Sequence, residues 1–467
     1  MRASSALSKS RHAAVALCTG LALTTGVLAA PAQAAQPAQP AAPATSPEAA
    51  QTPALPSGRT QYRTLADYQS DMAALAGRRP DLVKQVTLPH RTSEGRAVTG
   101  VEITDDVQQQ DGKPVLLITG MHHGNEWASG EVTMEFGHDL VANHGRDKRI
   151  TRLLDQVRVL LVPIVNVDGF VRNTRRTATN VDMNRNYGFG WSPNEPFPGS
   201  APWSEPETRN VRDTISSRQV TTYLTMHTCL SNMLYPPLQL KAGLPQDIDA
   251  FRSFADAMGT QNGYYHTTSA EDYETAGEVI DWSYYATRGL GVTVEVCTTP
   301  MGLPRTFESL VPDQYWGVGP NAGKGNRGAF LVAMEQAADR AAHSTITGHA
   351  PKGAVLTISK DFDMWTNPVP QPDGTSRPVS FPNRLTSTMR ADERGGHFVW
   401  DVNPSVRPIP PYQADGVHGN RTGFLQESWT LTCARPDGKV LQTLKLKVDR
   451  GKSVEANLHE CRKLFHR

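Results

Sequence analysis

The chain has 467 residues, of which 38% are hydrophobic and 20% charged, and its formal net charge is +1. This length leaves room for two domains with sizeable cores, and the composition is typical of globular rather than disordered or fibrous proteins. The near-neutral charge gives no electrostatic reason to expect a nucleic-acid partner, and we expect none.

The first residues have the features of an export signal. Three basic residues precede an uncharged apolar run over residues 13–30, and Ala32-Gln33-Ala34 is a small-residue cleavage pattern. We therefore predict a signal peptide over residues 1–34, with cleavage near Ala34, and a secreted protein. No later run is long and uncharged enough to span a bilayer, so we expect no membrane attachment.

Proline, alanine, glutamine and threonine dominate the next segment, which we interpret as a disordered spacer over residues 35–61. Cleavage after the signal would remove three positive charges and no negative ones, which shifts the formal charge from +1 to −2. Four cysteines would remain, and an even number in an exported chain favours two disulfides. They are Cys229, Cys297, Cys433 and Cys461.

From Tyr62 onwards, helix and strand patterns alternate. Apolar residues at helical spacing after Thr64 predict a helix that ends at Arg79-Pro80. Apolar runs predict strands over residues 98–103, 115–118, 157–165, 221–226 and 291–296. Because consecutive positions in these runs are apolar, we expect an α/β fold with a mixed, mostly parallel sheet sandwiched by helices. A last helix over residues 327–342 would complete this domain, residues 62–343.

The remaining chain, residues 344–467, has the pattern of β structure. Strand-like segments cover residues 354–358, 397–402, 429–433 and 440–448. Pro436-Asp437-Gly438 is a typical hairpin turn between the last two. We predict a small β-sandwich as a second domain.

Two histidines and a glutamate suggest a metal site. His123 and Glu126, three residues apart, follow one predicted strand, and His227 ends another. Ligands gather at the carboxyl ends of strands in open α/β sheets, so these side chains would converge. Two His and one Glu, with a fourth position for water, form a hydrolytic zinc site. Glu295, a lone carboxylate in an apolar run, needs a partner, and a metal-bound water is a good one.

Eight residues whose side chains could bind a metal or substrate, or transfer a proton, occur along the chain in an order that can be compared with known enzymes. They are His123, Glu126, Arg172, Asn184, Arg185, His227, Tyr273 and Glu295. This order, together with strings such as Val181-Asp182-Met183-Asn184-Arg185-Asn186, resembles the zinc metallocarboxypeptidases of the carboxypeptidase A type. The resemblance covers roughly residues 62–342.

The resemblance implies a mechanism. His123, Glu126 and His227 would hold one Zn²⁺, which lowers the pKa of the water in the fourth position to about 7. Glu295 would take the proton of that water and give it to the leaving amine, and Arg172 would hydrogen-bond the developing oxyanion.

The resemblance also implies how the substrate binds. Asn184, Arg185 and Tyr273 would bind the free α-carboxylate of a peptide or protein, because the planar fork of an arginine matches a carboxylate. Ile280 matches the family's pocket floor and favours an apolar terminal side chain, whereas Glu278 could attract Lys or Arg. We expect a broad or apolar preference and a monomeric enzyme.

Some features depart from the family or are open to two interpretations. Asn125 stands where carboxypeptidase A has an arginine, and this Gly-Asn-Glu string resembles the regulatory carboxypeptidase branch. The tail, which opens with Ile346-Thr347-Gly348, loosely resembles the transthyretin-like domain of that branch. We interpret His122 and Glu131 as ordinary structural residues rather than ligands.

Each of two cysteines, Cys229 and Cys297, lies two residues beyond a proposed active-site residue. If their strands are neighbours, a disulfide can join them, and Cys433 would then pair with Cys461.

Two other functions fit the same sequence. The zinc chemistry could act on a cell-wall peptide or another amide with a free carboxylate. Alternatively, the protein could be an inactive, zinc-bearing peptide-binding module. Glu295 and Arg172 argue against the second alternative, because binding alone needs neither a base nor an oxyanion donor.

Overall fold

A computed structural model describes residues 52–297, 305–318, 323–391, 396–412 and 423–465. The predicted signal peptide, and the predicted spacer before residue 52, lie outside these ranges. Residues Gln51–Arg467 form one compact unit. In the described part of the chain, no helix is both long enough and apolar enough to cross a membrane.

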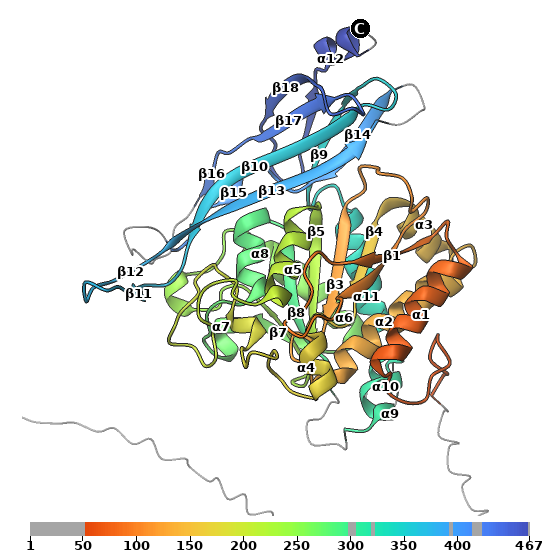
Figure 1. Ribbon diagram of the computed structural model, residues 1–467. Coiled ribbons are helices and arrows are strands. Elements are labelled where there is room, and N and C mark those ends of the chain that lie inside the picture. The colour runs from red at the N-terminus through yellow and green to blue at the C-terminus, as the bar shows by residue number, and fades with distance from the viewer. Residues whose placement is uncertain (1–51, 298–304, 319–322, 392–395, 413–422, 466–467) are drawn as a thin grey trace, which may run out of the picture. The chain divides into compact units, whose positions relative to one another are not determined.

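The centre of the fold is an eight-stranded sheet with the strand order β1-β2-β4-β3-β5-β8-β6-β7 (Figure 1). Its strands are β1 (Val83–Thr87), β2 (Thr99–Ile103), β3 (Val115–Gly120), β4 (Arg158–Val162), β5 (Val220–His227), β6 (Asn232–Tyr235), β7 (Tyr265–Thr268) and β8 (Leu290–Glu295). The central strands β4, β3, β5 and β8 are parallel, whereas the pairs β1-β2, β2-β4 and β8-β6 are antiparallel. Every residue of β3, β4 and β5 is buried, which confirms the predicted mixed sheet.

Helices cover both faces of this sheet. Figure 1 shows α5 and α8 on one side of the central strands and α1 and α2 on the other. The helices are α1 (Leu65–Arg78), α2 (Trp127–Asn143), α3 (Lys148–Gln156), α4 (Val167–Arg172), α5 (Pro206–Ser216), α6 (Ile248–Asn262), α7 (Ser269–Asp272), α8 (Val279–Thr287), α9 (Phe307–Leu310), α10 (Pro312–Trp316) and α11 (Asn326–Ala338), with the 3-10 turns η1 (Met183–Arg185) and η2 (Leu240–Ala242). Helix α1 begins where predicted, because Thr64 and Asp67 exchange the hydrogen bonds of a capping box.

The last residues of the predicted spacer contact the catalytic part of the chain. Leu55 is buried, and Ser57 donates hydrogen bonds to Glu135 from its backbone nitrogen at 2.9 Å and its hydroxyl at 2.6 Å. Nε of Arg59 lies 3.0 Å from the carboxylate of Asp71. Carboxylates on α1 and α2 that lie away from water need such partners, and the segment before α1 supplies them.

The C-terminal region is built of strands, as predicted. They are β9 (Ser344–His349), β10 (Val355–Trp365), β11 (Val369–Pro370), β12 (Ser376–Arg377), β13 (Ser380–Arg390), β14 (His397–Val402), β15 (Arg407–Pro408), β16 (Phe424–Leu425), β17 (Trp429–Ala434), β18 (Val440–Leu446) and β19 (Ser453–Ala456), followed by α12 (His459–Leu464). The sheets β13-β10-β17-β18 and β14-β9-β19 share one apolar core, in agreement with the predicted sandwich. A disulfide joins Cys433 to Cys461, which confirms this predicted pair.

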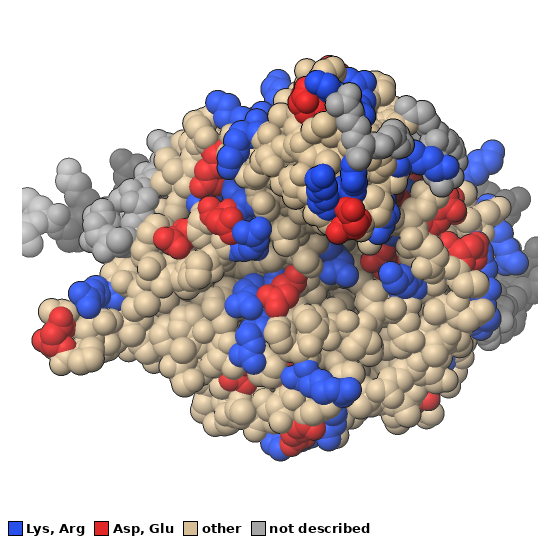
Figure 2. Space-filling view, turned by 45° about the horizontal axis from the view of Figure 1, so that its top comes forward, with Lys and Arg blue, Asp and Glu red and all other residues tan. Residues whose placement is uncertain are grey.

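The charged side chains on the face in Figure 2 are of mixed sign. Lys and Arg residues in blue and Asp and Glu residues in red are interspersed, and this view shows no continuous field of one sign. The distribution agrees with a formal net charge of only +1 for the whole chain.

Candidate active site

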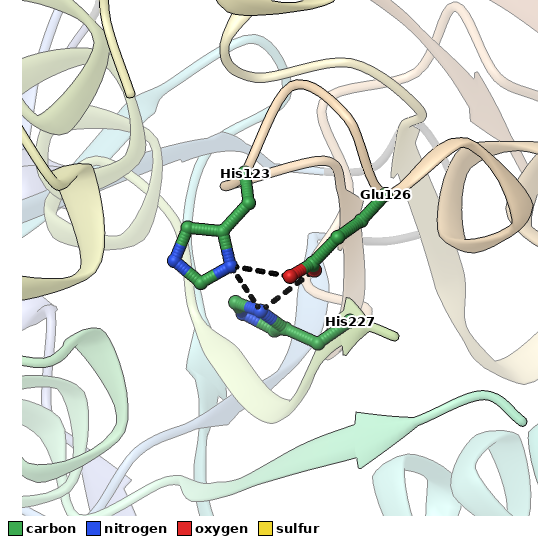
Figure 3. A group of neighbouring side chains, drawn as sticks. All are labelled: His123, Glu126 and His227. Carbon is green, nitrogen blue, oxygen red and sulfur yellow. Dashed lines mark hydrogen bonds and ion pairs between the residues drawn. The ribbon is translucent and has the colours of Figure 1, made fainter. Parts of the chain in front are cut away.

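Three possible metal ligands converge where two central strands end (Figure 3). Strand β3 ends at Gly120, and the turn after it carries His123 and Glu126, whereas His227 is the last residue of β5. Nδ1 of His123 lies 2.7 Å from Oε1 of Glu126, and Nδ1 of His227 lies 3.1 Å from its Oε2. The two Nδ1 atoms are 3.2 Å apart. Donor atoms from distant parts of the chain therefore form one small triangle.

This set of donors fits a zinc ion. Two imidazoles and one carboxylate, all buried, are ligands that Zn²⁺ takes when a fourth position is left for water. Burial acts to lower the pKa of His123, but the charges of Glu126 and Asp182 outweigh it and raise this pKa to about 9. The cluster therefore attracts positive charge.

Asp182, which was not predicted as a site residue, orients one of these ligands. Its Oδ1 lies 3.1 Å from Nε2 of His123, so the Nδ1 atom of that ring faces Glu126. A carboxylate behind a metal-binding histidine fixes the orientation of the ring and the position of its proton. Asp182 lies within the string Val181–Asn186 that carried the resemblance, and that is the signal by which it could have been found.

Glu295 lies beside this cluster as the last residue of β8. Strands β5 and β8 are parallel neighbours, and their register places Glu295 opposite His227. In the described part of the chain, its buried Oε2 has no hydrogen-bond partner. Burial, and secondly the charge of Glu126, raises the pKa of Glu295 to about 8. A carboxylate of this kind can accept and return a proton near neutral pH.

Arg175 lies beside the cluster, and the oxyanion role expected of Arg172 stays a prediction. The guanidinium of Arg172 is half exposed and pairs with Glu94. Nη1 of Arg175 lies 3.7 Å from Oε1 of Glu126, and its carbonyl accepts a hydrogen bond from Gly124 at 3.2 Å. The reason for the difference is that α4 ends at Arg172, and the turn after it brings Arg175 back towards the first two ligands.

The three predicted carboxylate-binding residues lie together. Asn184 and Arg185 belong to the turn η1, and Nη2 of Arg185 lies 3.5 Å from the hydroxyl of Tyr273. Two carboxylates already contact this guanidinium, because Oε1 of Glu278 is 2.9 Å from Nη1 and Oε2 of Glu195 is 3.3 Å from Nε. Glu278 was expected from the sequence as a possible partner for Lys or Arg, whereas no local pattern pointed to Glu195. The group is therefore a buried arginine in a negatively charged surrounding.

Ile280, His122 and Glu131 were also considered from the sequence, and the structure shows what surrounds each of them. Ile280 is fully buried in the main hydrophobic core, and its role in the pocket stays a prediction. Nε2 of His122 lies 2.9 Å from the hydroxyl of Tyr187, and Oε1 of Glu131 accepts a hydrogen bond from the backbone of Arg63 at 2.6 Å. Both groups thus have structural partners.

Comparison with known proteins assigns the family. The family model described as zinc carboxypeptidase matches residues 68–313, which is more than half of the 467-residue chain. The chain belongs to the zinc carboxypeptidase family. A single zinc ion is the metal of this family, and the cluster of His123, Glu126 and His227 is where this member offers ligands for it.

The chain has curated relatives of moderate similarity. It is 29% identical to carboxypeptidase B of Rattus norvegicus over 256 residues, which are 48% of this chain and 60% of the relative. It is 30% identical to mast cell carboxypeptidase A of Mus musculus over 211 residues, which are 38% of this chain and 50% of the relative. The chain thus spans between half and three fifths of the length of these relatives.

A solved structure shares the fold. The crystal structure of carboxypeptidase A from Helicoverpa armigera matches 59% of this chain and 74% of its own, with a TM-score of 0.52 and 21% sequence identity. This likeness concerns the fold alone.

A disulfide joins the chain segments that follow two of the candidate site residues. Cys229 and Cys297 are bonded, with their Cα atoms 4.7 Å apart, which confirms the predicted pair. They lie two residues beyond His227 and Glu295 respectively. The bond therefore closes the two neighbouring strands just past the metal cluster.

Proposed function

We propose that this protein is a zinc-dependent carboxypeptidase that hydrolyses the C-terminal peptide bond of peptides or proteins. The observation that carries the proposal is the triangle of His123, Glu126 and His227 with the carboxylate of Glu295 beside it, whose Oε2 has no hydrogen-bond partner among the described residues. Bound zinc supplies a water of lowered pKa and a positive charge that polarises a carbonyl.

In this proposal, Glu295 moves the proton. Its carboxylate accepts a proton from the attacking water and returns it to the nitrogen of the leaving amino acid. Its pKa of about 8 suits both steps near neutral pH, because a general base works best when its pKa is close to the working pH. Arg175 takes the part first expected of Arg172 and donates a hydrogen bond to the carbonyl oxygen as negative charge develops on it.

Arg185, with Asn184 and Tyr273, would bind the terminal carboxylate of the substrate. Of the guanidinium nitrogens of Arg185, Nη1 and Nε contact Glu278 and Glu195. Nη2 lies on the side of Tyr273, where the substrate carboxylate would bind. A terminal amide loses a charge-assisted hydrogen bond, which is worth about 1.5–3 kcal/mol, so we expect roughly a hundredfold preference for the free acid.

The same site could act on a cell-wall peptide or another amide with a free carboxylate, since the proposed chemistry needs no more than that group and an amide bond. An inactive binding module is a weaker alternative. Binding alone needs neither a base such as Glu295 nor a cation such as Arg175 beside the metal cluster.

We also propose that the protein is exported and acts as a monomer. The N-terminal sequence supports export through its basic and apolar segments, and two disulfides agree with an oxidising compartment.

One experiment tests the main proposal. The purified protein is incubated with one peptide as the free acid and as the C-terminal amide, with and without a chelator. We expect single amino acids to be released from the free acid, with activity lost on chelation and restored by zinc. Equal cleavage of both peptides, or activity that survives complete removal of the metal, would contradict the proposal.

A further inference from the structure

The loop that follows the proposed carboxylate-binding residues is held by the C-terminal β region. Gly190 donates a backbone hydrogen bond to the carbonyl of Trp365 at 3.0 Å, and Asn367 donates one to the carbonyl of Trp191 at 2.9 Å. The side-chain amide of Asn367 also donates to the carbonyl of Gly190 at 2.6 Å. Three hydrogen bonds thus fix a short stretch of the catalytic part to the end of β10 and the residues just after it.

The same loop, Tyr187–Trp191, is packed closely against aromatic side chains of that region. Gly188 lies where an added Cβ would come within 2.7 Å of Cζ of Phe381, so the backbone touches this ring on β13. The ring of Phe189 lies 5.1 Å from that of Tyr412, and both are buried. A close-packed interface of this kind transmits a shift of one side to the other.

At its other end, the loop is joined to the proposed carboxylate-binding group. Tyr187 follows Arg185 by two residues and donates a backbone hydrogen bond to Gly277 at 2.9 Å, in the segment between Tyr273 and Glu278. The chain beyond the loop carries Glu195, whose carboxylate contacts Nε of Arg185 at 3.3 Å. A displacement of the loop would therefore move several groups around Arg185 together.

We propose that the C-terminal β region positions Arg185 for the terminal carboxylate of the substrate, with Asn367 and Phe381 as the positioning residues. The C-terminal β region would then contribute to substrate binding, and would not be a functionally independent domain. The inference rests on the proposed function. A catalytic or binding group displaced by about 1 Å can cost roughly a hundredfold in rate, so a modest loosening of the loop is measurable.

The chain offers a matched control. Asn403, also in the C-terminal region, donates its side-chain amide to the carbonyl of Val220 at 3.0 Å, at the start of β5 and away from the loop. Asn403→Ala removes one side-chain hydrogen bond between the same two parts of the protein, whereas Asn367→Ala removes two, to the carbonyl of Gly190 and, at 3.3 Å, to Oε1 of Gln239. Both side chains are buried, so each change should lower stability, and the thermal unfolding of each variant measures by how much.

The test measures kcat, KM, zinc content and thermal stability of the full-length zinc-loaded wild type and both variants, with one peptide as free acid and as amide. We expect Asn367→Ala to raise KM for the free acid about tenfold and to leave kcat and zinc content near wild type. The ratio of kcat/KM for the free acid over that for the amide should therefore fall. Asn403→Ala should lower stability alone. Phe381→Leu, which removes the ring beside Gly188, should shift KM in the same direction as Asn367→Ala.

Equal KM values in the two asparagine variants, with an active wild type, would overturn this inference and leave the proposed function in place. A wild type that releases no amino acid would overturn both. Hydrogen exchange over residues 184–191 provides an independent measure, since it should increase in Asn367→Ala and not in Asn403→Ala. Unchanged exchange in Asn367→Ala would also contradict the inference.

Discussion

His227 and Glu295 are register partners on the adjacent parallel strands β5 and β8. A proposed metal ligand and a proposed base are thus fixed by the backbone of one sheet, and the disulfide between Cys229 and Cys297 closes the same two strands just beyond them. Sites built on strands hold their geometry better than sites built on loops alone. Changing one of the two side chains should therefore leave the other in place.

Glu295→Gln should reduce kcat by a factor of about 10² to 10⁴, because the amide cannot accept the proton of the attacking water. Zinc content, measured by atomic absorption, should remain at one ion per chain. His227→Ala should instead lose zinc together with activity. A Glu295→Gln variant with more than a tenth of the wild-type kcat would rule out Glu295 as the base.

Arg175→Ala should lower kcat/KM by about 10² to 10³, the usual cost of losing one donor to the oxyanion. Arg172→Ala is the matched control, since it removes the same charge three residues away, where the side chain pairs with Glu94. Its kcat/KM should stay within about threefold of wild type, the range of a surface change. The reverse order of effects would restore the role to Arg172.

Glu278→Gln should weaken the relative cleavage of peptides that end in Lys. Arg185 already contacts Glu278 and Glu195, so the carboxylate of a substrate adds to a surplus of negative charge that a cationic side chain offsets. Removing one charge should lower the ratio of kcat/KM for C-terminal Lys over Leu by about tenfold.

Glu274→Gln provides the control for this prediction, because Glu274 is exposed and belongs to the same segment. An unchanged Lys-to-Leu ratio in the Glu278 variant would leave the buried Ile280 as the determinant and favour an apolar preference.

Removing the two disulfides should have different effects. Replacing Cys229 and Cys297 together by serine should lower both zinc affinity and kcat/KM, because the bond closes the strands that carry His227 and Glu295. Replacing Cys433 and Cys461 should cost about 2–4 kcal/mol of stability and leave kcat/KM unchanged. Equal activity in both double variants, once corrected for folded protein, would refute the local role of the first bond.

Stability should depend on the protonation of Asp281. Burial raises the pKa of this carboxyl to about 8, and in the described part of the chain its Oδ1 has no hydrogen-bond partner. The folded protein therefore keeps a proton that the unfolded chain releases at about pH 4. The contribution of this group to stability is complete below pH 4 and is lost as the pH rises towards 8.

In the Asp281→Asn variant the side chain cannot ionise, so this loss of stability with rising pH should disappear. We expect the variant to be more stable than wild type by roughly 2 to 4 kcal/mol at pH 7, and the difference to shrink towards pH 4. Urea unfolding at several pH values measures both effects. Parallel stability curves for the two proteins would show that Asp281 does not carry the dependence.

The sequence predicted the central strands well where they are buried on both faces. Runs of consecutive apolar residues located β3, β4, β5 and β8, since a buried parallel strand needs them. The short strands β1, β6 and β7 were not predicted. In β1 and β7 most residues are partly or fully exposed, so hydrophobic runs did not reveal them.

The order of the candidate metal-binding, catalytic and substrate-binding residues along the chain indicated the family, the metal and most of the candidate site. Ligand types and their spacing are properties of the sequence itself. The tertiary structure decided which arginine faces the metal cluster, since that depends on where α4 ends. It also decided that Glu195 reaches Arg185, and that the C-terminal strands hold the loop after Arg185. These are contacts between segments far apart in the chain, and no local pattern of residues encodes how such segments meet.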